Sequence, residues 1–147
     1  MKESEILNNL SRAISRKIGK LNSVIRTKLT AEFNAQGLDL TAEMYSVLRC
    51  LWEKNGVNQQ ELAEMSYKEK ANLTKLIDHL ERRGLVYREM NQADKRNKLI
   101  FLTPRANAIK GKVLRIAQKS VLVPESNIPE QKLRIAREVL DTLLEQY

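Results

Sequence analysis

The stretch that decides the fold is Leu80-Glu81-Arg82-Arg83-Gly84-Leu85-Val86, followed by Asp94-Lys95-Arg96 and then by Leu102-Thr103. This pattern predicts a helix that ends in basic residues at Gly84, a strand, a charged loop and a second strand, because glycine readily terminates helices. A helix beside a basic hairpin can place one element in a DNA groove and the other against the adjacent backbone. DNA binding is therefore the leading hypothesis.

The composition also favours an anionic partner. The 147 residues carry 26 Lys and Arg against 18 Asp and Glu, a net charge of +8. Such a balance is typical of proteins that bind nucleic acid or a membrane surface, although a merely basic protein has it too. No apolar run approaches the ~20 residues of a membrane span, and no apolar block of the signal-peptide type lies near the N-terminus. Cys50 is the single cysteine, so we expect a cytoplasmic protein without disulfides or membrane attachment.

Apolar residues recur at helical spacing over residues 7–29, which predicts one long N-terminal helix closed by Gly37. So long an apolar stripe is difficult to bury on one small domain. We expect a helix of a second subunit to cover it in a homodimer; the alternative is packing within the monomer. The stripe consists of Leu7, Leu10, Ile14, Ile18, Leu21, Ile25 and Leu29.

Capping residues place shorter helices between this stripe and the hairpin. Thr41 and Asn58 are suited to begin two of them, and a third spans about residues 70–83. The expected strands cover residues 85–90 and 98–102. Thr103-Pro104 then begins a helix that residues 123–129 interrupt, before a last apolar helix.

The predicted fold is mainly α with a small β-hairpin, namely a winged helix-turn-helix with an N- and C-terminal helical dimerisation layer. We expect a single domain over residues 1–147. Within it, about residues 41–103 form the DNA-binding part, and about residues 1–36 and 104–147 supply the dimerisation helices.

The motifs Leu62-Ala63-Glu64, Leu80-Glu81-Arg82-Arg83-Gly84-Leu85-Val86, Asp94-Lys95-Arg96 and Leu102-Thr103 occur in a set order. In order and spacing they resemble the MarR family of winged-helix transcriptional regulators. The resemblance implies a ligand-responsive repressor without a cofactor, which acts as a homodimer on a near-palindromic operator in double-stranded DNA. It also implies a small-molecule effector.

Polar side chains on the third short helix and on the wing are the candidate DNA contacts; a merely solvated polar face is the alternative. Helix-turn-helix proteins read base edges with the N-terminal part of this helix, where Asn suits adenine and Lys suits guanine. We expect Arg96 to enter a minor groove, and Arg82 to contact phosphate or to pair with Asp78. The full set is Lys70, Asn72, Thr74, Lys75, Arg82, Lys95, Arg96, Lys98, Gln59 and Gln60.

Other residues have supporting or alternative roles. As the resemblance implies, Asp94 is expected to pair with an arginine and hold the wing loop. Met44, Tyr45 and Trp52 are either core or the lining of an effector pocket between the long helix and the DNA-binding part.

Two reactive side chains are interpreted as structural. Cys50 is expected to be a small buried hydrophobe, and a redox switch is the alternative. His79 has no second histidine or Cys-x-x-Cys nearby, so no metal site is expected.

The predicted function is therefore sequence-specific DNA binding by a regulator of transcription. A winged-helix module that mediates protein–protein contacts is the alternative. A small enzyme is a third possibility, which is disfavoured because the sequence has no recognisable nucleophile, metal or cofactor motif.

Overall fold

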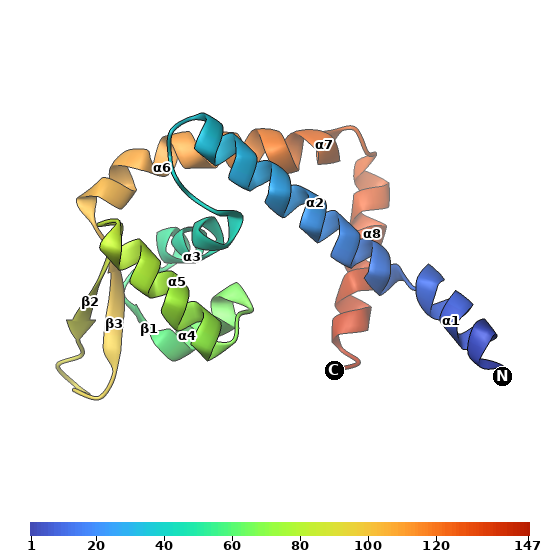
Figure 1. Cartoon of the computed structure of the whole chain (residues 1–147), viewed down its shortest axis with the longest axis horizontal. Coiled ribbons are helices and arrows are strands. Elements are labelled where there is room, and N and C mark those ends of the chain that lie inside the picture. Colours follow the sequence, from blue (N-terminus) through green and yellow to red (C-terminus); the bar gives the residue numbers. More distant parts are fainter.

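The computed structural model describes residues 1–147. The elements follow in the order α1 (Glu3–Arg12), α2 (Ile14–Ala35), α3 (Ala42–Glu53), β1 (Val57–Asn58), α4 (Gln59–Ser66), α5 (Lys70–Arg82), β2 (Val86–Met90), β3 (Lys98–Leu102), α6 (Pro104–Ala117), the π-helical turn η1 (Gln118–Leu122), α7 (Val123–Ser126) and α8 (Glu130–Leu144). In Figure 1, α3, α4, α5 and the strands form one lobe, from which α2 and α6 lead away to α1 and α8. Both termini lie on the side away from the sheet.

Side-chain caps set the starts of α3 and α4, as predicted. The Thr41 hydroxyl accepts a hydrogen bond from the Met44 amide at 3.1 Å, and the Asn58 side chain accepts one from the Glu61 amide at 2.8 Å. These bonds satisfy amide groups that the first turn of a helix leaves unpaired. Gly84 ends α5 at a φ of 68°, a conformation that favours glycine.

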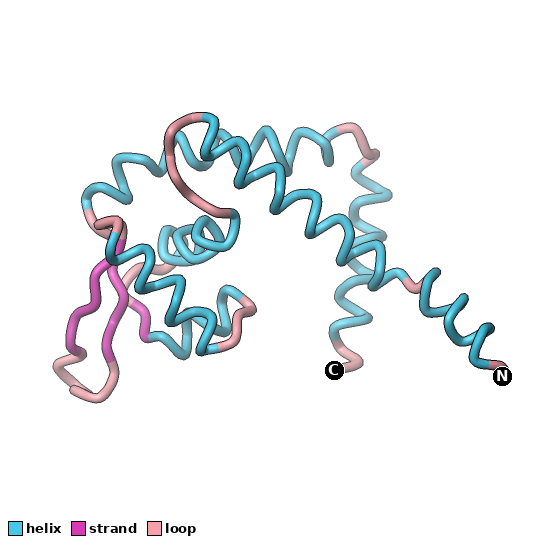
Figure 2. Tube along the Cα trace, viewed as in Figure 1, coloured by secondary structure: helices cyan, strands magenta, loops and turns pink.

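The predicted hairpin is part of a three-stranded antiparallel sheet with the order β1-β3-β2. Strands β2 and β3 pair from Val86 opposite Leu102 to Met90 opposite Lys98. The additional strand β1 pairs Val57 with Ile100. The prediction of a hairpin alone was incomplete, because a strand of two residues has no recognisable periodicity. Figure 2 shows the strands together at one end of the molecule.

The segment before β1 adds two further bonds to β3. The Asn55 side chain accepts a hydrogen bond from the Leu102 amide at 2.9 Å. The Gly56 amide donates to the Ile100 carbonyl at 3.0 Å. The connection between α3 and α4 is therefore attached to the inner strand of the wing.

One apolar core holds the lobe together and extends to α2. The inner faces of α3 and α5 are buried, and Leu29 and Phe33 join them from the C-terminal half of α2. The fully buried large side chains include Phe33, Leu48, Leu51, Leu62, Leu73, Ile77, Leu80 and Ile100. This core fixes the orientation of α5, since its inner stripe packs on α3 and α4.

The long N-terminal helix is broken, contrary to the prediction. Ala13, with a ψ of 139°, separates α1 from α2. The Ser11 hydroxyl donates to the Leu7 carbonyl at 2.9 Å, a local bond of a kind that bends helices. Periodicity alone could not indicate the break, because alanine is a good helix former. The apolar side chains Ile6, Leu7, Leu10, Ile14, Ile18, Leu21 and Val24 are exposed.

The helix that follows the wing also differs from the prediction. Thr103 caps α6 and Pro104 stands in its first turn, as expected. The helical path does not stop at residue 123, because it continues through η1 and α7 and ends only after Ser126. The π turn precedes Pro124 and widens the backbone where a proline ring would otherwise crowd the previous turn. No residue of α8 is buried, and none of the helices is long and apolar enough to cross a membrane.

Candidate nucleic-acid interface

Helix α5 presents a polar face to solvent at its N-terminal end. Lys70 is its first residue, and Lys70, Asn72 and Lys75 are all exposed. The opposite face, with Leu73 and Leu76, is buried against the lobe. The helix therefore holds these polar side chains outward and in a fixed relation to one another.

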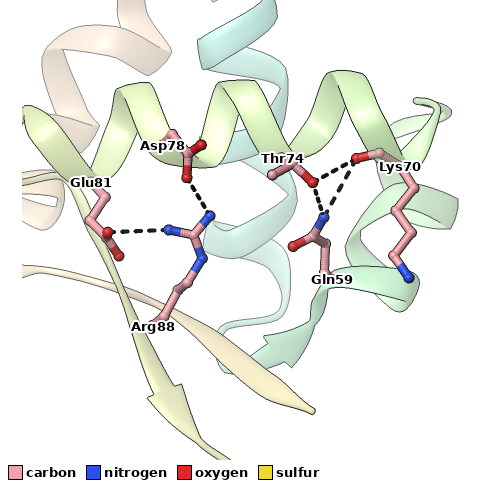
Figure 3. A network of polar contacts seen from close by, with 6 residues as sticks. All are labelled: Gln59, Lys70, Thr74, Asp78, Glu81 and Arg88. Atoms are coloured by element: carbon pink, nitrogen blue, oxygen red, sulfur yellow. Dashed lines mark hydrogen bonds and ion pairs between the residues drawn. The ribbon is translucent and has the colours of Figure 1, made fainter. Parts of the chain in front are cut away.

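Gln59 and Thr74 form hydrogen bonds that help to hold the first turns of α5 in position. The Gln59 amide donates to the Thr74 hydroxyl and, at 3.5 Å, to the Lys70 carbonyl. Thr74 is half-buried, and its hydroxyl donates to the Lys70 carbonyl at 2.9 Å. Figure 3 shows this triangle between the start of α4 and the first turns of α5. The Gln59 amide nitrogen is thus engaged within the protein, while the expected contact of Gln59 with DNA stays a prediction.

The Gln60 side chain, in contrast, is exposed and donates to the Glu64 carboxylate within α4 at 3.1 Å. It lies beside Gln59 at the start of the helix. Of the two glutamines, Gln60 is exposed and Gln59 is half-buried.

Arg88 on β2 connects the wing to α5 and was not identified from the sequence. Its guanidinium bonds the Asp78 carboxylate at 2.7 Å and the Glu81 carboxylate at 3.2 Å, as Figure 3 shows. The Arg88 side chain is only 18% exposed. The predicted alternative pairing of Asp78 with Arg82 is wrong, because the carboxylate is turned toward the wing. Arg82 is exposed and makes no ion pair, so its charge faces solvent.

The wing loop is ordered by short-range bonds around Asp94. One carboxylate oxygen accepts from the Arg96 amide at 3.1 Å, and the other accepts from the Asn97 side chain at 3.2 Å. Asp94 thus holds the loop, but its partners are a backbone amide and an asparagine, and not an arginine side chain as predicted. The side chains of Lys95, Arg96 and Lys98 remain exposed.

The lobe therefore carries cations on two joined elements. Lys70, Lys75 and Arg82 extend from α5, and the wing adds its own cations beside them. Arg88 ties the two elements together through Asp78 and Glu81, which holds the exposed cations of α5 and of the wing in a fixed relation. A helix with exposed base-reading side chains beside a cationic hairpin suits a major groove and its flanking phosphates.

A cavity of about 610 Å³ lies between α2 and the lobe. Its walls come from α2, from α3, and from the turn that leads into α5, including Tyr45, Lys68 and Asn72. Of the three predicted pocket residues, only Tyr45 lines it. Met44 is buried in the core, and Trp52 lines neither this cavity nor the one beside it.

A second cavity of about 670 Å³ adjoins Tyr45 on the side of α6. Its walls include Arg49, Leu114 and Arg115. Burial raises the pKa of the Tyr45 hydroxyl, which disfavours its ionised form.

Cys50 is buried in the core, with 1% of its surface exposed. Burial raises the pKa of the Cys50 thiol, so that the unreactive protonated form is favoured. These observations agree with the interpretation of Cys50 as a small hydrophobe.

Fold and surface together define the winged helix-turn-helix class of proteins. Residues 40–98 match the family model described as MarR family. Over these residues, which are less than half of the chain, the sequence is similar to that family.

One curated relative is the "Transcriptional regulator HosA" of Escherichia coli O157:H7. It is 38% identical over 80 residues, which cover 54% of this chain and 59% of that regulator. The chain thus matches little more than half the length of this relative.

Two solved structures show the same fold. The Staphylococcus aureus MepR–DNA complex has a TM-score of 0.83 at 20% identity and covers 92% of this chain and 98% of that one. CouR from Rhodococcus jostii RHA1, bound to p-coumaroyl-CoA, has a TM-score of 0.77 at 26% identity and covers 91% and 93%.

Proposed function

We propose that this protein is a regulator of transcription that binds double-stranded DNA in a sequence-specific manner. The observation that carries the proposal is that α5 and the wing both expose cations and are joined through the bonds of Arg88 to Asp78 and Glu81. In this proposal Asn72 and Lys70 contact base edges, while Arg96 enters the minor groove. The match to a MarR-family model and the likeness to a DNA-bound fold support it.

The proposed roles of the segments within residues 1–147 are based on which side chains are buried. The capped and packed segment 41–103 would be the DNA-binding part, and residues 1–36 and 104–147 would form a dimerisation layer. In support, α1 and α8 contain no buried residue, although both carry apolar side chains such as Leu10 and Leu140. A two-fold dimer would present two α5 helices to successive major grooves of a near-palindromic operator.

Repression that responds to a small molecule completes the proposal. The cavity between α2 and the lobe includes Asn72, one of the proposed base contacts. A ligand that binds more tightly to one arrangement of α2 and the lobe would favour that arrangement. The resulting shift in DNA affinity is limited by the difference between the ligand's affinities for the two arrangements. The ligand-bound state of CouR, a protein of similar fold, supports a ligand site.

The test is a selection of bound duplexes from a random DNA pool, followed by affinity measurements at several salt concentrations. A sequence-specific regulator should enrich a near-palindrome and bind it with steep salt dependence. Failure to enrich any sequence, together with salt-insensitive binding, would favour a protein–protein interaction module.

A further inference from the structure

The cations of the N-terminal segment fall into two groups with different surroundings. No acidic residue lies between Glu5 and Glu32, although this stretch holds six lysines and arginines. The two cations nearest the lobe have carboxylate partners, since Arg26 is bonded to Glu43 and Lys28 Nζ lies 3.9 Å from a Glu32 oxygen. The other four cations have no carboxylate within ion-pair distance. They are Arg12, Arg16, Lys17 and Lys20.

These four unpaired cations line one hollow, which has a volume of about 660 Å³ and lies where α1 meets α2. Ser11 is the fifth residue of its wall, and no apolar side chain and no carboxylate belongs to the wall. The cations without partners are therefore gathered around a common space.

The break at Ala13 contributes to this arrangement. In one continuous helix, Arg12, Arg16 and Lys20 would follow one another along a single ridge, because they are spaced four residues apart. The ψ of 139° at Ala13 interrupts the helix, so that Arg12 comes from the end of α1 and the other cations come from the first two turns of α2. The wall of the hollow is thus built from two helices.

The hollow is separate from the surfaces proposed to bind DNA and to form the dimer. Figure 1 shows α1 and the start of α2 at the opposite end of the molecule from β2 and β3. Arg16 and Lys20 each lie two positions from Ile18, and residues two apart lie on nearly opposite sides of a helix. A dimer that buries the apolar stripe would therefore leave these cations free.

We infer that this hollow binds a chain of phosphate groups, as in inorganic tripolyphosphate. Four like charges around one space repel one another, and an anion with several charges removes this repulsion. The guanidinium groups of Arg12 and Arg16 suit phosphate oxygens, with which arginine forms paired hydrogen bonds. Since no apolar side chain lines the hollow, an organic part of a ligand would gain no apolar contact there.

The first experiment titrates the full-length protein with tripolyphosphate in a calorimeter, at low ionic strength because salt screens exposed charges. Wild type should bind the ion, and the double variant Arg16→Gln, Lys20→Gln should bind it about tenfold more weakly. The control variant Lys132→Gln, Arg134→Gln removes the same charge at exposed positions of α8 and should retain the wild-type affinity. Circular dichroism establishes that both variants are folded. Absence of binding by wild type, or equal weakening in both variants, would overturn the inference.

ATP and adenosine distinguish the inorganic ion from a nucleotide. ATP carries the same phosphate chain joined to a base, so it should bind with an affinity similar to that of tripolyphosphate. Adenosine has no phosphate and should not bind. Measurable binding of adenosine, or much tighter binding of ATP than of tripolyphosphate, would show that the base is recognised and would contradict an all-phosphate site.

The cations of α5 provide the last comparison, because a DNA-binding surface can also attract phosphate. The variant Lys70→Gln, Lys75→Gln should weaken binding to duplex DNA and leave tripolyphosphate binding unchanged. The variant of Arg16 and Lys20 should show the opposite pattern. Loss of tripolyphosphate binding in the α5 variant alone would refute the inference. If wild type binds tripolyphosphate as described but binds no DNA, only the proposed function fails.

Discussion

Arg88 of strand β2 and Asp78 of helix α5 form an ion pair in which Nη2 and Oδ1 are 2.7 Å apart. The same guanidinium reaches Glu81 one turn further along α5, at 3.2 Å. A single side chain thus links the wing to two turns of the helix proposed to read DNA. The planar guanidinium fixes both direction and distance, which a lysine could not do.

Replacement of Arg88 by Met should loosen the wing. The change removes both ion pairs, so we expect a loss of about 1 kcal/mol in the free energy of unfolding, as for partly exposed pairs. Operator affinity should fall as well, because the wing would no longer be held beside α5. Urea unfolding and fluorescence anisotropy measure the two effects.

The matched control is Arg49→Met, which removes an ion pair with Glu53 within α3, away from the wing. It should leave operator affinity near the wild-type value. If both variants weaken DNA binding equally, Arg88 has no special part in positioning the wing.

Removal of the Arg96 side chain and removal of the Asn72 side chain should change the salt dependence of DNA affinity differently. Arg96→Ala removes one cation per subunit, so in a dimer the slope of log affinity against log salt should flatten by about two units. Asn72→Ala removes no charge, so the slope should stay the same while about 1–3 kcal/mol of preference at one base position is lost. Titrations on operator and scrambled duplexes distinguish these results. Wild-type affinity and slope for Arg96→Ala on both duplexes would exclude the wing from DNA binding.

Tyr67→Gly should stabilise the protein. Tyr67 is 94% exposed and has a φ of 53°, so its side chain loses little contact while its backbone is in a region unfavourable for residues other than glycine. We expect a gain of up to about 1 kcal/mol in the free energy of unfolding. Tyr67→Ala retains the strained backbone and should show no such gain, so equal effects of the two substitutions in urea unfolding would contradict this explanation.

Leu10 and Leu140 test the proposed dimerisation layer. Both side chains are exposed and apolar, on α1 and α8 respectively. Aspartate at both positions should produce a monomer in analytical ultracentrifugation, because charges in a buried apolar interface are strongly unfavourable. The same substitutions at Tyr67 and Met90, exposed side chains outside the proposed layer, provide a control for general surface effects. A dimer that survives the Leu10 and Leu140 changes would place the interface elsewhere.

Cys50 should be unreactive toward mild peroxide. Because burial raises the pKa of its thiol, the folded protein holds the thiol proton more tightly than the unfolded chain does. The corresponding stability is present at neutral pH and is lost as the pH rises above the ordinary thiol pKa. Wild type should therefore lose more stability at alkaline pH than Cys50→Ser, and both should respond alike to peroxide in operator-binding assays. Loss of DNA binding by oxidised wild type alone would restore the redox alternative.

The features predicted correctly from the sequence are those that depend on neighbouring residues. The caps at Thr41, Asn58 and Thr103 and the stop at Gly84 are bonds or conformations within a few positions. The buried stripe of α5 follows from helical spacing in the same way. Such local preferences act before the chain has any tertiary structure, so they can be read from the sequence.

Three of the features that were missed depend on partners far away in the chain. Strand β1 exists because β3 lies beside it, and Gln59 turns inward because Thr74 is within reach. Arg88 was overlooked because its partners Asp78 and Glu81 lie on a helix and it lies on a strand. No spacing rule covers contacts between elements of different periodicity.

The bonds that Asn55 and Gly56 make to β3 have a mechanical consequence. They attach the wing to the end of α3, and Arg88 attaches it to α5. We therefore expect the whole lobe to move as one rigid body. A ligand between α2 and α3 would rotate the lobe relative to α2 without changing the internal structure of the lobe. The contacts within one half-site would then keep their geometry, and only the distance between half-sites would change. Operators with altered spacing should therefore recover binding in the ligand-bound protein, whereas operators with altered half-sites should not.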